Sequence, residues 1–173
     1  YYYAGDELGM ANIRFDNIAD YRDIETINTY QHLKDTGGDL QKFLASAKIT
    51  ARDNGRTPFQ WSSEQNAGFT EGKPWIKINP DYKTVNVASE DNNPNSCLNY
   101  FRKMANLRKT HKVLIYGTYS LLDKNNPNIY AYTRTLNGKK YLVLLNFSTK
   151  QATTNVSPGF GKAVCLIDNY EKP

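Results

Sequence analysis

The sequence predicts an α+β chain, namely the last β/α unit of a (β/α)8 TIM barrel followed by an antiparallel β-sandwich domain. One observation is the order of elements, in which a short buried strand precedes a long loop and an amphipathic helix. Another is the change after about residue 112 from a helical period to the alternation of strands. The 173 residues are too few for a whole barrel, which needs about 250 residues.

The first region, residues 1–112, is expected to form the barrel unit. It begins with Tyr1–Ala4, an apolar run that is typical of a strand buried on both faces, as in a parallel sheet. Neither an initiating methionine nor a signal peptide precedes this run, so we expect the chain to be a piece of a longer protein.

Two helices are predicted next, over residues 23–33 and 39–51, from the spacing of their apolar side chains. Asp39 is of a residue type that favours the N-cap position of the second helix. The segment from Arg52 to Asn92 has little periodicity. Long segments of this kind are usually functional or disordered, and its aromatic content favours an ordered loop.

A third helix is predicted from Cys97 to about Thr110. Arg108 falls within its apolar arc, and a cation on a packing face needs a partner. We therefore expect Arg108 to pair with a carboxylate or to cap backbone carbonyls at the helix end. Cys97 and Cys165 are too few for a disulfide framework or a metal site. They are expected to be buried thiols, or a disulfide if the protein is exported.

The second region, residues 113–173, is predicted to be all-β. Asn137-Gly138 is a strong hairpin signal because both residue types accept a positive φ. Alternating or apolar runs predict five strands, at residues 113–122, 129–136, 140–147, 152–156 and 162–167.

Charge and hydropathy exclude two classes of partner. The chain carries 22 Lys and Arg against 17 Asp and Glu, a net charge of +5. The surplus equals the five cations between Asn93 and Leu122, a stretch without Asp or Glu, and no nucleic acid recognition motif accompanies them. We interpret them as a solvated helix face and expect no nucleic acid partner. No membrane is expected either, because no apolar run reaches the roughly 20 residues that a membrane helix needs.

Several motifs together indicate a family. The segment Tyr3–Met10 resembles the eighth-strand motif of glycoside hydrolase family 13, the α-amylase superfamily. Further segments narrow the resemblance to its oligo-1,6-glucosidase and α-glucosidase subfamily: Asp20–Glu25, Ala51–Trp61, Asn66–Thr70, Pro74–Ile76, Asn79–Lys83 and Leu107–His111. The resemblance covers nearly the whole chain. It implies a catalytic-barrel unit over residues 1–112 and a C-terminal β-domain over 113–173, whose last strand is expected to be missing.

The resemblance also implies a function. The parent would be a retaining α-glucosidase that hydrolyses short α-1,6- or α-1,4-linked gluco-oligosaccharides from the non-reducing end, without a cofactor or metal. The family's nucleophilic Asp, general-acid Glu and third Asp lie upstream, so this chain is expected to be inactive alone and to need the rest of the catalytic domain as its partner. Trehalose-6-phosphate hydrolase and sucrose isomerase are alternatives within the family. A carbohydrate-binding or interaction module is the alternative from another class.

Three side chains are candidates for substrate binding. Arg52 resembles the arginine that holds the non-reducing glucose, and a guanidinium suits vicinal hydroxyls and a carboxylate; the alternative is a tie within the loop. Glu25 resembles the acid that contacts the leaving sugar; the alternative is a solvent-facing glutamate on a helix. Arg56 is the third candidate, for which a structural role is favoured. Trp61 and Trp75 could stack on sugars, but buried packing is expected. Two unpaired cysteines favour a bacterial cytoplasmic location, with export as the alternative.

Overall fold

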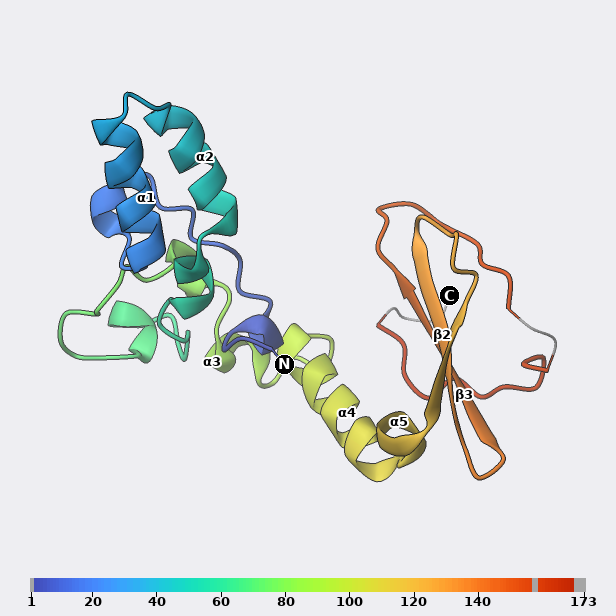
Figure 1. Cartoon of the computed structure of the whole chain (residues 1–173). Coiled ribbons are helices and arrows are strands. Elements are labelled where there is room, and N and C mark those ends of the chain that lie inside the picture. The colour runs from blue at the N-terminus through green and yellow to red at the C-terminus, as the bar shows by residue number, and fades with distance from the viewer. Residues whose placement is uncertain (1, 157–158, 170–173) are drawn as a thin grey trace. The chain divides into compact units, whose positions relative to one another are not determined.

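The structure is a computed structural model that describes residues 2–156 and 159–169 (Figure 1). Its contacts divide the chain into two compact units, Tyr1–Phe101 and Arg102–Pro173, which we call the loop unit and the sheet unit. The helices are α1 (Ile24–Asp35), α2 (Leu40–Thr50), α3 (Val87–Glu90), α4 (Cys97–Thr110) and α5 (Val113–Tyr116). The strands are β1 (Thr118–Leu122), β2 (Ile129–Leu136) and β3 (Lys139–Asn146). Short 3₁₀ helices occupy Asp6–Leu8, Ile18–Asp20, Arg52–Arg56, Gln65–Gly68 and Pro80–Lys83.

Helices α1 and α2 form a hairpin in the loop unit, which confirms both sequence predictions (Figure 1). Each begins at an aspartate N-cap, because the carboxylate of Asp23 accepts from the Thr26 N–H and that of Asp39 from the Lys42 N–H. The hairpin packs on the main core of this unit, whose fully buried members are Phe15, Tyr21, Ala47 and Ile76.

The expected strand at Tyr1–Ala4 is wrong for Tyr2, Tyr3 and Ala4, which lie in irregular backbone; Tyr1 is outside the described residues. The side chains of Tyr2 and Tyr3 are exposed, and the N–H of Tyr3 donates to the carboxylate of Asp6 at 2.9 Å. A strand needs a neighbouring strand to receive its ladder hydrogen bonds. In the described residues the sheet contains β1, β2 and β3 alone, so this segment has no such neighbour.

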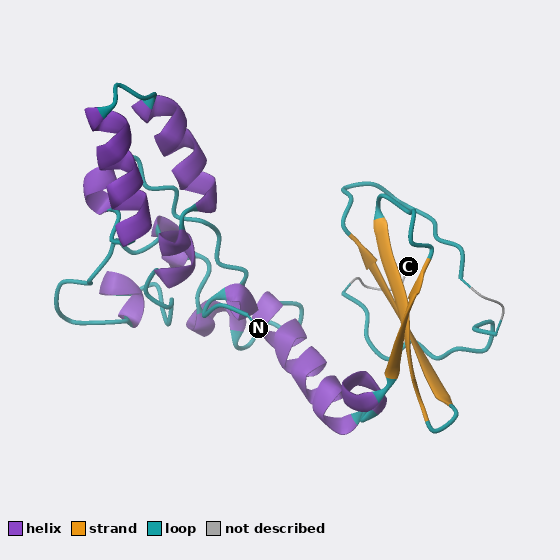
Figure 2. Cartoon of the chain, viewed as in Figure 1, coloured by secondary structure: helices purple, strands orange, loops and turns teal. Residues whose placement is uncertain are grey.

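The segment Arg52–Asn92 is an ordered loop, as the sequence predicts, built from short helical turns and irregular backbone (Figure 2). Its sharpest bend is at Asn66, Ala67 and Gly68, which follow one another at φ values of 53°, 57° and 66°. The Ala67 carbonyl accepts from the N–H groups of Trp61 and Ser62, at 2.9 and 3.0 Å. These bonds hold a backbone shape that is unfavourable for non-glycine residues.

The expectation of buried packing is wrong for Trp61 and Trp75, which are 52% and 51% exposed. Trp61 packs edge-on against Phe59, with the ring centroids 4.7 Å apart, and keeps its other surface open.

Helix α4 covers the residues that the sequence predicts, Cys97–Thr110. Of the two partners expected for Arg108, a carboxylate or a backbone carbonyl, the structure shows the carbonyl: the Arg108 Nη1 donates to the Leu114 carbonyl at 2.6 Å. That carbonyl belongs to α5, however, and Arg108 is exposed, so its placement on a buried face is wrong. The expectation of buried thiols is also wrong, because Cys97 and Cys165 are free and exposed. No helix in the described ranges has the length and apolarity to cross a bilayer.

The sheet unit holds an antiparallel sheet in the order β1-β2-β3. The hairpin between β2 and β3 is confirmed: Leu136 pairs with Lys139, and Asn137 and Gly138 both adopt positive φ, 50° and 74°. The strand expected from residue 113 begins only at Thr118, because Val113–Tyr116 forms the helical turn α5. A short apolar run suits a helix or a strand equally, so the period could not separate them.

The strands expected at 152–156 and 162–167 are wrong, since both segments are irregular (Figure 1). Their polar groups bond elsewhere: the Thr154 hydroxyl and the Asn155 N–H donate to the Asp123 carboxylate, at 2.9 and 3.2 Å. Val164 is 80% exposed. The β-domain therefore contains a three-stranded sheet in its described part, and the second sheet of the expected sandwich does not form there.

Candidate functional site

The three candidate binding residues lie together where the segment after α2 meets the start of α1. Arg52 begins the 3₁₀ helix Arg52–Arg56, and Glu25 lies in the first turn of α1. The Arg52 Nη2 donates to the Glu25 Oε2, and its Nη1 lies 3.8 Å from the Asp23 Oδ1. Both ends of the Arg52–Glu25 pair are solvent-accessible, so the pair can meet a ligand.

Asp53 connects the 3₁₀ helix Arg52–Arg56 to the backbone at the start of α1. It is fully buried, and its Oδ2 accepts from the backbone N–H groups of Arg22 and Asp23, at 2.6 and 2.8 Å. Its Oδ1 has no hydrogen-bond partner and lies 3.6 Å from the Arg56 Nη1. One carboxylate thus fastens the backbone before α1 to the segment that carries Arg52.

Asp23 is the second buried carboxylate of the cluster. Its Oδ2 caps α1 by accepting from the N–H and hydroxyl of Thr26, at 3.1 and 3.0 Å, and its Oδ1 accepts from the Arg56 Nη1 at 3.2 Å. Burial raises the pKa of Asp23, but the Thr26 hydrogen bonds, with Arg52 and Arg56, outweigh it and leave the pKa below its ordinary value. Arg56 therefore lies against two buried carboxylates. This position is compatible with the structural role that the sequence favours for it.

A hollow of about 280 Å³ opens beside the cluster. The lining combines the charged side chains of Arg52 and Glu25 with hydroxyl residues of α1 and α2 and with apolar Phe43 and two alanines. The lining residues are Asp23, Glu25, Thr26, Thr29, Phe43, Ser46, Ala47, Thr50, Ala51 and Arg52. Such a set of donors and acceptors around an apolar patch can hold a polyhydroxylated molecule.

The carboxylates of the cluster are poorly placed for glycosidic bond cleavage. Retaining hydrolysis needs a nucleophile and an acid/base about 5–5.5 Å apart, each free to reach the sugar. Asp23 and Asp53 are buried and committed to backbone and arginine partners, and Glu25 is paired with Arg52. The arrangement can bind and orient a sugar but offers no carboxyl pair for the chemical step.

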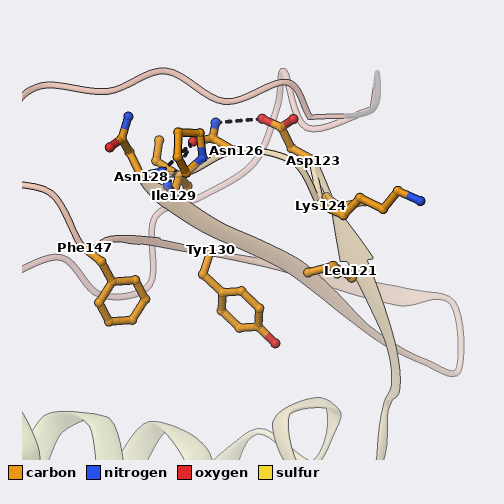
Figure 3. Close-up of a pocket in the computed structure, with 10 residues that line it drawn as sticks. Leu121, Asp123, Lys124, Asn126, Asn128, Ile129, Tyr130 and Phe147 are labelled. Carbon is orange, nitrogen blue, oxygen red and sulfur yellow. Dashed lines mark hydrogen bonds between the residues drawn. The ribbon is translucent and has the colours of Figure 1, made fainter.

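A second hollow, of about 310 Å³, lies in the sheet unit (Figure 3). Tyr130 and Phe147 point to the same side, while the Asn126 side-chain amide donates to the Asp123 carboxylate at 2.9 Å in the connection between β1 and β2. Hydrogen bonds from Asn126, Thr154 and Asn155 lower the pKa of Asp123, and all three donate to its Oδ2. This hollow carries no group arranged for catalysis.

Sequence reasoning missed the role of Asp53. It stands in Arg52-Asp53-Asn54-Gly55-Arg56, and the flanking arginines do not reveal that its carboxylate bonds the backbone N–H groups of Arg22 and Asp23. In residues 2–156 and 159–169, no group of three or more His, Cys, Asp or Glu side chains is placed to hold a metal ion.

Two family models match the chain. The model of the alpha amylase, catalytic domain covers residues 1–117, and that of the maltogenic amylase, C-terminal domain covers residues 119–173.

Individual relatives are similar to the whole length of the chain or to most of it. An oligo-1,6-glucosidase of Parageobacillus thermoglucosidasius is 48% identical, over 99% of this chain and 31% of that protein. The crystal structure of a trehalose-6-phosphate hydrolase of Bacillus licheniformis matches with a TM-score of 0.87 and 38% identity, over 98% of this chain and 31% of the other. A mutant isomaltulose synthase of Erwinia rhapontici was crystallised with its natural substrate sucrose. Its structure matches with a TM-score of 0.78 and 51% identity, over 83% of this chain and 26% of the other. The chain spans about a third of the length of the curated relatives it matches.

Proposed function

The chain belongs to the alpha-amylase family, and from that membership we propose that it is the C-terminal part of a retaining α-glucosidase. The substrates proposed are short gluco-oligosaccharides with α-1,6 or α-1,4 linkages, cleaved from the non-reducing end. The similarity to an oligo-1,6-glucosidase at 48% identity supports this substrate class. The rest of the catalytic domain is the proposed partner, and neither nucleic acid nor a membrane is required.

The observation that carries the proposal is the Arg52–Glu25 pair beside the 280 Å³ hollow. A guanidinium presents a rigid fork of donors that suits the vicinal hydroxyls of a glucose ring. In our proposal Arg52 binds the non-reducing glucose, Glu25 contacts the leaving sugar, and Arg56 supports Arg52 through Asp23. The chain thus contributes binding and orientation, while the carboxyl pair for cleavage comes from the other part of the protein.

A second reaction within the family is supported by the solved structures. The trehalose-6-phosphate hydrolase and the isomaltulose synthase are 38% and 51% identical to this chain over the matched residues. Since these enzymes differ in substrate, the chain's shared architecture is compatible with each, and the alternatives are hydrolysis of trehalose 6-phosphate and isomerisation of sucrose.

The test uses the full protein that carries this chain. Purified enzyme is assayed with isomaltose, maltose, trehalose 6-phosphate and sucrose, and the products are separated by chromatography. Preferred release of glucose from isomaltose or maltose supports the α-glucosidase. Preference for the phosphorylated sugar, or formation of isomaltulose without net hydrolysis, replaces it with an alternative.

A companion assay uses residues 1–173 alone with a chromogenic α-glucoside. We expect no turnover above buffer, because the chain's buried carboxylates are already engaged. Turnover at an enzymatic rate would contradict the proposed division of labour. Sugar binding without turnover by the full protein would instead favour a carbohydrate-binding module.

We also propose a bacterial cytoplasmic location and a domain boundary near residue 112. The location is supported by the two free, exposed cysteines, Cys97 and Cys165, which a reducing compartment would keep unbonded. Export, the alternative, would be recognised by finding the protein in the culture medium or periplasm.

A further inference from the structure

We propose that Asp53 is a positioning residue for the sugar-binding pair: it holds the backbone that carries Arg52 against the start of α1, which carries Glu25. The inference rests on the proposed function and goes beyond it by assigning a role to a side chain that cannot itself touch substrate. Asp53 is fully buried, so any influence on the sugar must pass through neighbouring residues.

The Asp53 carboxylate bonds the backbone just before α1. Its Oδ2 accepts from two successive backbone N–H groups, those of Arg22 and Asp23, which immediately precede α1. A carboxylate that accepts two N–H groups makes strong, charge-assisted bonds with little freedom to move. The start of α1 is thereby fixed relative to the 3₁₀ helix Arg52–Arg56.

The direct contact between Arg52 and Glu25 is an exposed ion pair. Arg52 bonds Glu25 and approaches Asp23 at 3.8 Å, and both ends of the pair are more than half exposed. An exposed ion pair is worth little and cannot by itself fix two backbone segments. The buried connection through Asp53 can, because it lies out of solvent and binds backbone rather than flexible side chains.

The negative charge of Asp53 also acts on Arg56. The Asp53 Oδ1 accepts no hydrogen bond and lies 3.6 Å from the Arg56 Nη1, while Arg56 also bonds Asp23 at 3.2 Å. The carboxylates of Asp53 and Asp23 both face the guanidinium of Arg56. Glu25 therefore pairs with Arg52. Without the charge of Asp53, Arg56 would draw more on Asp23, the N-cap of α1.

The variant that tests this role is Asp53→Asn in the full enzyme, measured alone and together with Arg52→Ala. Misplacement of a binding group by about 1 Å can lower a rate roughly 100-fold. We therefore expect Asp53→Asn to lower kcat/KM by about 10- to 100-fold when Arg52 is present. In the Arg52→Ala background the same change should cost clearly less, because one of the two side chains whose relative position Asp53 fixes is already gone.

A merely structural role gives a different pattern, which overturns the proposal: equal fold-losses in both backgrounds, or no loss in either. Asp53→Glu keeps the charge but shifts the carboxylate by one methylene, and it provides the same comparison if the asparagine variant fails to fold. Asp16→Asn is the matched control, since Asp16 is an exposed carboxylate paired with Lys48, and its kcat/KM should not change. A wild-type enzyme that hydrolyses no α-glucoside overturns the proposed function itself, whereas an active wild type with additive losses overturns only the role of Asp53.

Discussion

The loop unit and the sheet unit are held together in different ways. All but one of the buried polar residues in the described ranges lie in the loop unit, among them Asp53, Gln60 and Asn86, and each of these three bonds backbone groups; the exception is Thr133. The sheet unit depends on backbone ladders, with β2 paired to both neighbours. The conformation of the loop unit therefore rests on individual side chains, and that of the sheet unit on a repeating pattern.

The largest effect should come from removing a buried carboxylate of the loop unit. Asp53→Ala leaves the N–H groups of Arg22 and Asp23 without their acceptor and Arg56 with one carboxylate fewer. Breaking a buried ionic group of this kind destabilises a protein by about 3–5 kcal/mol. Urea unfolding of the full protein measures the loss.

The control for this comparison is Asp16→Ala, which removes an exposed carboxylate from the same unit. Exposed ion pairs contribute little to stability, so its unfolding midpoint should stay close to that of the wild type. Equal losses for Asp53→Ala and Asp16→Ala would contradict the claim that the loop unit depends on its buried polar side chains.

The next largest effect concerns binding rather than folding. Arg52→Ala should lower kcat/KM roughly 100-fold, about 2.7 kcal/mol, because a charged hydrogen-bond donor to the sugar is lost. The melting temperature should stay within a few degrees, since the Arg52–Glu25 pair is exposed. Enzyme kinetics and calorimetry on one preparation give both values. A large fall in melting temperature would make Arg52 a structural tie instead.

In the sheet unit, sensitivity should be confined to places where backbones approach closely. A Cβ at Gly117 would lie 2.5 Å from the Val113 carbonyl oxygen and 3.0 Å from the Thr135 nitrogen. Gly117→Ala should therefore destabilise by about 1–3 kcal/mol through overpacking. Gly161→Ala is the matched control, because a Cβ there meets nothing within 4 Å. Equal unfolding midpoints for both variants would show that this end of β1 can shift freely.

The smallest effect should appear at acid pH, in the loop unit. The pKa of Asp23 is lower in the folded protein than in the unfolded chain, where it is about 3.9. Its contribution to stability is therefore present above that value and is lost as pH falls through the window below it. Melting temperatures measured between about pH 6 and about pH 3 should fall less steeply for Asp23→Asn than for the wild type. Parallel profiles would contradict the assignment.

Local signals predicted α1, α2, α4 and the hairpin well. Asp39 caps α2 and Asn137-Gly138 forms the hairpin turn, because a single residue type decides each geometry. Failures occurred where a partner decides. The strands expected at Tyr1–Ala4 and at 162–167 have the right composition but no neighbouring strand in the described residues, and a sequence pattern cannot supply one.

The candidate site was predicted in its exposed part and missed in its buried part. Arg52, Glu25 and Arg56 meet at the start of α1, and the resemblance to a known family had selected Arg52 and Glu25. The connection through Asp53 spans about thirty positions along the chain and joins side chain to backbone. Backbone acceptors and donors are common to all residues, so no residue pattern marks such a bond before the fold is known.

The bend at Asn66, Ala67 and Gly68 restricts how this loop can be redesigned. Ala67 is fully buried at positive φ, so any larger side chain would meet both crowding and an unfavourable backbone. Gly68 has a positive φ too, and a Cβ there would lie 2.7 Å from the Ser62 Oγ. A library randomised at these positions would yield few residue types that still allow folding. Transplanting the loop into another scaffold would require moving residues 61–72 as one cassette.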